Sequence, residues 1–139
     1  MAIENETILI KTSAKSLNDI TLRIKEQVRS SNIQDGICTL FIKHTSASLI
    51  IQENADPSVL HDIENFFKKL VPENNDLYVH TAEGSDDMPA HIRSLLTNTH
   101  LSIPIINKEL QLGTWQGIYL YEHRNHFHER KVIVNIIGE

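Results

Sequence analysis

Short apolar segments separated by polar turns outnumber the helical segments of this chain, and this ratio limits its fold more than any other feature. Runs rich in β-branched and aromatic side chains predict about seven strands, joined mostly by short connections. Short connections favour antiparallel pairing, because parallel neighbours need a long crossover between them. The predicted strands cover residues 7–12, 37–43, 49–52, 76–80, 101–106, 109–112, 117–122 and 131–137.

The clearest helix begins after Asp56 and ends at Pro72. Asp56 is a preferred N-cap residue, and Pro57 suits the first helical position. The apolar residues between them follow a helical period, which predicts a helix that faces the core. Two further helices are expected, one from Ser16 to about residue 31 and one from residue 88 to about residue 97.

These elements together predict an α+β fold. We expect a compact α/β sandwich with a largely antiparallel sheet and about three helices. The length of 139 residues fits a single domain over residues 1–139.

Composition excludes several classes of function. The net charge is −5 and the chain has no basic block, so we expect no nucleic-acid partner. No apolar run approaches the roughly 18–20 residues that a membrane span needs, so we expect no membrane partner. The single cysteine, Cys38, and an acidic N-terminus without an apolar core indicate a cytoplasmic protein.

Residues 113–124 combine ring and polar side chains in a strand-like run, a pattern that indicates a site. Thr114, Gln116 and Arg124 can hydrogen-bond a phosphate or carboxylate, and Arg124 can do so with two parallel bonds. Trp115 can form one side of a slot for an aromatic ring. An equally good interpretation has Trp115 in the core or at a subunit interface.

A second candidate lies where a buried strand ends at His44. Thr45, Ser46 and Ser48 follow it, and their hydroxyl groups can orient the imidazole or contact a phosphate. A hydrogen-bonded structural histidine is the competing interpretation. Asn54 lies just before the helix that starts at residue 57 and can reach an anion bound at that helix start.

The third candidate is the segment 80–91, in which two histidines flank three carboxylates. His80 ends a predicted strand over 76–80, and His91 lies in the first turn of a predicted helix. A catalytic zinc takes three protein ligands, which His44, His80 and His91 can supply if folding brings them together. Alternatively, Asp86 or Asp87 only caps the helix and the histidines bond locally. His123, His126 and His128 are interpreted as part of an exposed turn.

At these residues the chain strongly resembles the YjbQ family over nearly its full length. The matching motifs occur in the family's order. They cover residues 44–48, 53–57, 83–91, 102–105, 112–119 and 137–139.

The resemblance implies a homotrimer with candidate sites near subunit boundaries. It also implies a thiamine-phosphate synthase-like transferase, which joins a hydroxymethylpyrimidine diphosphate to a thiazole phosphate and releases pyrophosphate. A divalent metal, zinc or magnesium, would be held by His44, His80 and His91. The expected partner is a small phosphorylated substrate.

Two alternatives remain for the same residues. One is a metal-dependent hydrolase in which Asp87 acts as general base. The other is a non-enzymatic trimeric protein that binds a metal or ligand. For catalysis we predict Asp87, Trp115, Gln116 and Arg124; for substrate or phosphate binding we predict Thr45, Ser46, Ser48, Asn54 and Thr114.

Overall fold

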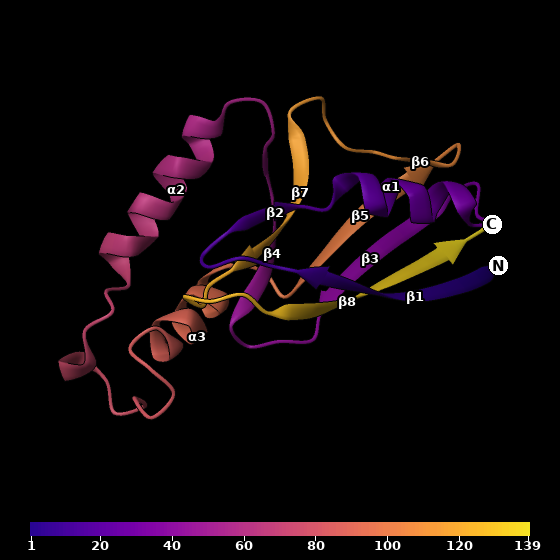
Figure 1. The fold of residues 1–139 in the computed structure, drawn as a ribbon. Helices are drawn as coiled ribbons and strands as arrows, with labels where there is room; N and C mark the ends of the chain where they lie inside the picture. Colours follow the sequence, from indigo (N-terminus) through magenta and orange to yellow (C-terminus); the bar gives the residue numbers. More distant parts are fainter.

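The computed structural model describes all residues from 1 to 139 and contains eight strands, three α-helices and one 3₁₀ turn (Figure 1). In chain order they are β1 (Ala2–Lys11), β2 (Leu17–Asp19), α1 (Thr21–Ser30), β3 (Gly36–Ile42), β4 (Ala47–Glu53), α2 (Pro57–Leu70), η1 (Asn75–Leu77), α3 (Asp87–Leu96), β5 (His100–Ile106), β6 (Glu109–Leu110), β7 (Gln116–Glu122) and β8 (Glu129–Gly138).

Two sheets form the sandwich, and every strand pair in them is antiparallel. One sheet has five strands in the order β1-β8-β3-β5-β6, and the other has three in the order β2-β7-β4. The α+β sandwich predicted from the sequence is therefore confirmed.

The core lies between the inner faces of the two sheets and the buried side of α1. Strand alternation places Ile118 and Leu120 of β7 on the inner face, where they are fully buried. Ile24 and Val28 of α1 join the same cluster. The other side of β7 carries Tyr121, whose ring packs edge-on against Phe67 of α2 at 6.1 Å between centroids.

The start of the first helix is predicted wrongly. Residues 17–19 form β2, which pairs with residues 119–121 of β7, so the helix begins only at Thr21. The N-cap residue is Ile20, and the preceding Asp19 accepts a hydrogen bond from the Thr21 backbone N–H at 2.9 Å.

The strand predicted over 76–80 is also absent. A 3₁₀ turn at Asn75–Leu77 replaces its first half, and His80 follows in an irregular loop. Val79 is fully exposed, so no neighbouring strand or core holds this segment extended. The apolar residues here follow the strand period over too few positions to decide the structure.

Helix α2 has the predicted ends but not the predicted burial. Asp56 caps it by accepting from the Ser58 N–H at 2.9 Å. None of its residues is buried, and Phe66 and Leu70 are 60% and 53% exposed. Figure 1 shows why, because α2 stands beside the sandwich and not across one of its faces.

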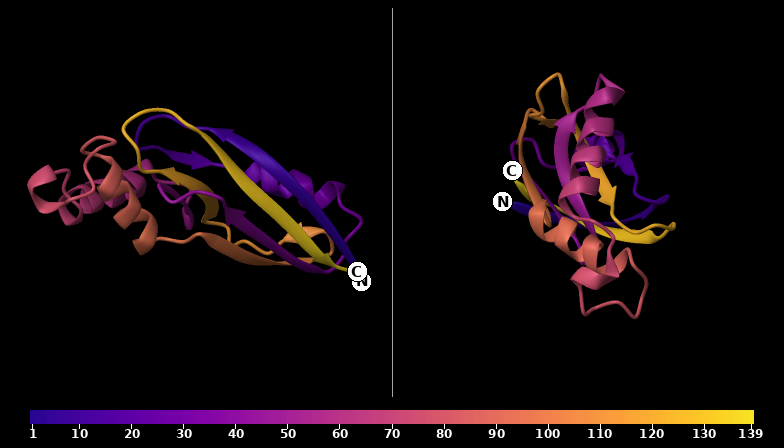
Figure 2. Two further views of the ribbon diagram at one scale, coloured as in Figure 1. Left: turned by 90° about the horizontal axis from the view of Figure 1, so that it is seen from below. Right: turned by 90° about the vertical axis from the view of Figure 1, so that its left-hand side faces the viewer.

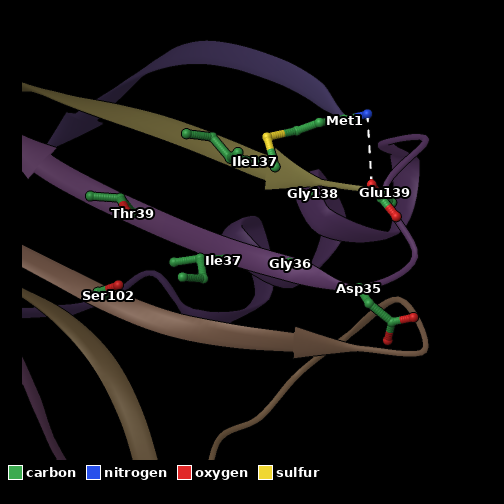
Figure 3. A pocket seen from close by; sticks show the side chains of 9 residues that line it. All are labelled: Met1, Asp35, Gly36, Ile37, Thr39, Ser102, Ile137, Gly138 and Glu139. Carbon is green, nitrogen blue, oxygen red and sulfur yellow. Dashed lines mark ion pairs between the residues drawn. The ribbon is translucent and has the colours of Figure 1, made fainter.

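The largest cavity, of about 550 Å³, lies on the outer face of the five-stranded sheet near both chain termini (Figure 3). Thr39 and Ser102 supply its only side-chain hydroxyls, and Met1, Ile37 and Ile137 supply its apolar side chains. Of the titratable groups at its rim, the Met1 amino group and Glu139 lie 3.9 Å apart, whereas Asp35 points away from them (Figure 3). Its size therefore does not make it the site of chemistry.

Candidate metal centre

Helix α3 places Asp87 and His91 one turn apart on the same face. Residues four apart in a helix are neighbours, so their side chains point to one spot. The loop before α3 turns at Gly84, which has a positive φ of 110°, and this turn returns His80 to the helix. Figure 2 shows α3 at the end of the molecule opposite to the chain termini.

His80, Asp87 and His91 bring their ligand atoms together. One ligand atom from each lies within 4.8 Å of the others. Asp87 Oδ2 is 2.8 Å from His80 Nε2 and 3.4 Å from His91 Nε2. The Asp87 side chain is 3% exposed, whereas those of His80 and His91 are 50% and 31% exposed. The cluster therefore has a buried carboxylate at its base and two imidazoles open to solvent.

A hydrogen bond to Thr45 orients His91. The Nδ1 atom of His91 lies 2.9 Å from the Thr45 carbonyl oxygen, which can only accept. A neutral His91 therefore carries its proton on Nδ1 and presents the Nε2 lone pair to the cluster. Metal-bound histidines commonly have this arrangement.

Arg124 holds the acidic residues of α3 in place. Its Nε donates to Asp86 Oδ2 at 2.8 Å, and its Nη1 lies 3.0 Å from Asp87 Oδ1. Its Nη2 donates to the Glu83 carbonyl oxygen at 3.0 Å. Burial raises the pKa of Asp86, but the hydrogen bonds from Arg124 and the Asn125 backbone together with the charge of Arg124 outweigh burial, so the pKa is lowered.

Each guanidinium nitrogen of Arg124 already has an acceptor within the chain, so this side chain positions Asp86 and Asp87 and keeps only the second N–H of each Nη for a further partner. Asp86 was expected only as a helix cap, but its side chain makes no capping bond and accepts from Arg124 instead.

His44 lies near this cluster but outside it. Its Nε2 accepts from the Lys131 backbone N–H at 2.8 Å, and its Nδ1 is 3.4 Å from Arg130 Nη1. Burial, followed by the charge of Arg130, lowers the pKa of His44. His44 and His91 both line one cavity of about 220 Å³. Two of the three predicted metal ligands are thus brought together, and Asp87 occupies the third place.

The hydroxyl groups that follow His44 are directed into the protein. Ser46 accepts a hydrogen bond from Arg130 Nη2 at 3.0 Å, and Ser48 Oγ lies 2.8 Å from His123 Nε2. Both serines are buried, so neither offers a hydroxyl to a ligand in this structure. Thr45 is exposed and lines the same cavity as His91.

The other predicted residues lie at the opposite end of β7, which we call the tryptophan end. Here the Asn54 N–H donates to the Trp115 carbonyl at 3.1 Å, and the Asn54 side chain donates to the Thr114 carbonyl at 3.4 Å. Gln116 accepts from the Gly113 N–H at 2.7 Å. Six residue steps along β7 separate Gln116 from Glu122, or about 20 Å. A single chain therefore does not bring Trp115 to Arg124.

A buried charge pair near the candidate metal centre was missed from the sequence. Glu122 and Arg130 are almost completely buried, with 2.5 Å between Glu122 Oε2 and Arg130 Nη2. Thr12 also donates to Glu122, at 2.6 Å. The alternation of Arg130 with the buried Val132 and Val134 was the available signal, because it places Arg130 on the inner face.

His123 is not in an exposed turn, as the sequence suggested. It is 1% exposed, and burial lowers its pKa to about 3, so it is neutral at physiological pH. Its ring packs against Tyr121 at 4.4 Å between centroids. His126 and His128 do lie in the exposed or half-buried turn that follows.

Known proteins match the chain over almost its whole length. A family model described as UPF0047 protein YjbQ-like matches residues 6–139. A UPF0047 protein of Synechocystis sp. is 55% identical over 134 residues, which cover 96% of this chain and 91% of that protein. The UPF0047 protein YjbQ of Escherichia coli O157:H7 is 41% identical, covering 96% of this chain and 97% of that protein.

Solved structures show the same fold. A YjbQ/UPF0047 family protein from Clostridium acetobutylicum superposes with a TM-score of 0.86 at 38% identity, covering 95% of this chain and 99% of that one. A hypothetical protein from Aeropyrum pernix K1 gives a TM-score of 0.88 at 26% identity, covering 98% and 99%. None of the three helices here has the length and hydropathy that crossing a membrane requires.

Proposed function

Since this chain belongs to the YjbQ-like UPF0047 family, we propose that the family fold serves here as a metal-dependent hydrolase of a small phosphorylated substrate. The observation that carries the proposal is the convergence of His80, Asp87 and His91 within 4.8 Å. Two imidazoles and one carboxylate are a ligand set of catalytic zinc sites.

The donor atoms fit zinc better than magnesium. Magnesium prefers oxygen ligands in an octahedron, whereas zinc accepts imidazole nitrogens and leaves a fourth position open in catalytic sites. His80 and His91 would each provide Nε2, and Asp87 would provide Oδ2. When bound, zinc lowers the pKa of a coordinated water to about 7 and polarises a phosphoryl oxygen.

The chain's own residues prepare this centre. The Thr45 carbonyl fixes the proton of His91 on Nδ1, and Arg124 engages Asp87 Oδ1 so that Oδ2 remains for the ion. With both oxygens of Asp87 occupied, this residue is better suited to hold an ion than to act as the general base suggested from the sequence.

The cavity beside His91 provides the place for a substrate. Its volume of about 220 Å³ lies below the usual range for drug-sized ligands, so it suits a phosphate group with a small substituent. His44 and the exposed Thr45 line it, and the Thr45 hydroxyl can donate or accept a hydrogen bond there while its carbonyl still holds His91.

The thiamine-phosphate synthase-like transferase is the second candidate. It needs a dry slot for an aromatic ring next to the centre that holds the diphosphate. Trp115 is 62% exposed and about 20 Å from that end of β7, so a second copy of the chain would have to supply the ring. The homotrimer implied by the family resemblance would meet this need, and the exposed apolar residues of α2 are consistent with such an interface.

Metal analysis of purified variants tests the primary proposal. We expect about one zinc per chain in the wild type, loss of zinc in His80→Ala and His91→Ala, and retention in His61→Ala. His61 is a suitable control because it is exposed on α2 and bonds only to Asn65. Full zinc content in His91→Ala would remove the ligand assignment.

Activity assays separate the two candidate reactions. For a hydrolase, zinc-loaded protein releases phosphate from small phosphate monoesters, stops after chelation and recovers when zinc is restored. For a transferase, the two purified precursors yield thiamine phosphate, and Trp115→Ala lowers that yield. A protein that binds zinc but performs neither reaction would favour the non-enzymatic alternative.

A further inference from the structure

A separate cavity of about 260 Å³ lies between the end of α2, the inner side of α3 and the turn after β1. It shares no lining residue with the cavity beside His91. Three of its six lining residues are cationic and one is acidic. The residues are Lys15, Lys68, Val71, Pro72, Glu73 and Arg93.

Arg93 is the most informative residue of this cavity. It is only 1% exposed, and its Nη1 donates to both carboxylate oxygens of Glu64 at 3.0 Å. Its Nη2 is buried without any hydrogen-bond partner. Leaving a buried charged donor unpaired is unfavourable, so such a group signals an expected acceptor.

The charges of the cavity favour an anion. Lys68 forms no ion pair, and Glu64 uses only one side of the Arg93 guanidinium. Lys15 has a positive φ of 41°, an uncommon conformation for a non-glycine residue, and it pairs with Glu73 at the cavity rim. A simpler role for Lys68 is to balance the carbonyl end of α2, but the neighbouring Lys69 can do this without lining the cavity.

Glu73 would compete with a bound anion for Lys15. Burial raises its pKa, but the hydrogen bonds from Lys15 and Asn125 and the charge of Lys15 together outweigh burial, so the pKa is lowered and the carboxylate stays charged. Asn125 also donates to Glu73, at 3.2 Å. An incoming anion would therefore share Lys15 with Glu73 or displace it.

We propose that this cavity binds an anion of the phosphate class, either inorganic phosphate or the phosphate group of a small molecule, between Arg93, Lys15 and Lys68. Its volume suits a phosphate with at most a short substituent. The guanidinium and two ammonium groups supply charge-assisted donors to its oxygens. The proposal does not depend on zinc.

The cavity is also linked to the metal centre. The Lys15 backbone N–H donates to the Arg124 carbonyl at 2.9 Å, and Arg124 in turn holds Asp86 and Asp87. Anion binding in the cavity can therefore affect the candidate metal centre through Arg124.

Calorimetric titration of the purified protein in the presence of a metal chelator tests the proposal, because the candidate zinc centre then neither binds nor hydrolyses the titrated phosphate. Inorganic phosphate and glycerol phosphate are titrated separately at low ionic strength, with chloride of matched ionic strength as the blank. Lys68→Gln should weaken phosphate binding about five- to tenfold, and Lys69→Gln should change it less than about twofold. Glu73→Gln should strengthen it severalfold, because it removes the competing carboxylate.

These opposite directions make the outcome decisive. All three substitutions are at exposed or half-exposed positions, so the variants should remain folded. Tighter binding of glycerol phosphate than of inorganic phosphate would identify a small molecule as the source of the group, and the reverse would identify the free ion. The absence of phosphate binding by the wild type, or equal binding by Lys68→Gln and the wild type, would overturn the proposal.

Discussion

The two ends of β7 carry polar residues of similar type in very different surroundings. At the end near Glu122, a carboxylate and the arginines Arg124 and Arg130 are buried and paired with one another or with α3. At the tryptophan end, Trp115 and Gln116 are exposed, and the contacts there are mainly single hydrogen bonds to the backbone.

This difference shows that a dense polar motif in a strand need not form one site. Only about 20 Å of strand separates the ends, but that length places them in two chemical environments. Buried charges are costly unless they are paired, so the Glu122 end depends on its partners. The tryptophan end is free to meet a ligand or another chain.

The largest expected contrast is in stability. Glu122→Ala leaves Arg130 buried without its partner and should lower the free energy of unfolding by about 3–5 kcal/mol. Gln116→Ala, at the exposed end of the same strand, should change it by less than about 0.5 kcal/mol. Urea unfolding monitored by circular dichroism measures both, and equal losses would show that the two ends do not differ.

A smaller effect is expected for the metal affinity. Asp87→Asn removes the charged oxygen at the base of the cluster and should weaken zinc binding at least about tenfold. The matched variant at the tryptophan end, Gln116→Ala, should bind zinc as the wild type does. Competition with a chromogenic chelator measures the affinity, and unchanged binding by Asp87→Asn would contradict the assignment.

The Asp86–Arg124 pair predicts how stability depends on pH. Because the folded-state pKa of Asp86 is lowered, its contribution is present above the unfolded value of about 3.9 and is lost as pH falls through the folded value. Wild type should therefore exceed Asp86→Asn in stability at pH 7, and the difference should shrink below about pH 4.

Urea unfolding at a series of pH values tests this dependence. The control variant is Asp62→Asn, since Asp62 is exposed on α2 and forms no ion pair. A constant difference between wild type and Asp86→Asn from pH 7 to pH 3 would rule out the pair as its source.

The smallest effect on stability is expected for substitution of Trp115. Trp115→Ala should alter the stability of a single chain by less than about 0.5 kcal/mol, because the side chain is 62% exposed. If a second copy covers Trp115, the variant instead dissociates at a higher protein concentration than the wild type. Sedimentation velocity over a dilution series distinguishes these results.

The sequence was sufficient to locate a strand or helix where one apolar period extended over many residues. Strands β3 and β8 and helix α2 were located within a few residues, because each combines a clear apolar period with end signals such as Asp56 and Pro72. Segment 17–19 was assigned wrongly, since the apolar pattern of three residues fits the strand period and the helical period equally well. Its pairing with β7 is a tertiary contact that local preference does not contain.

The candidate site was predictable only in part for a similar reason. Asp87 and His91 are four apart in a helix, so their convergence could be inferred from spacing. The position of His80 depends on an irregular loop, and that of His44 on a bond to Lys131 more than eighty residues away. The buried Arg93 gave no local signal, because its partner Glu64 lies on another element, α2.

The unburied helix α2 has a consequence for protein dynamics. A helix that contributes no residue to the core adds little to the cooperative unit, so it can open without unfolding the sandwich. Amide protons of α2 in an isolated chain should therefore exchange with deuterium much faster than those of β3. A partner that covers the helix would slow this exchange, so the exchange rate of the α2 amides indicates whether the chain is assembled.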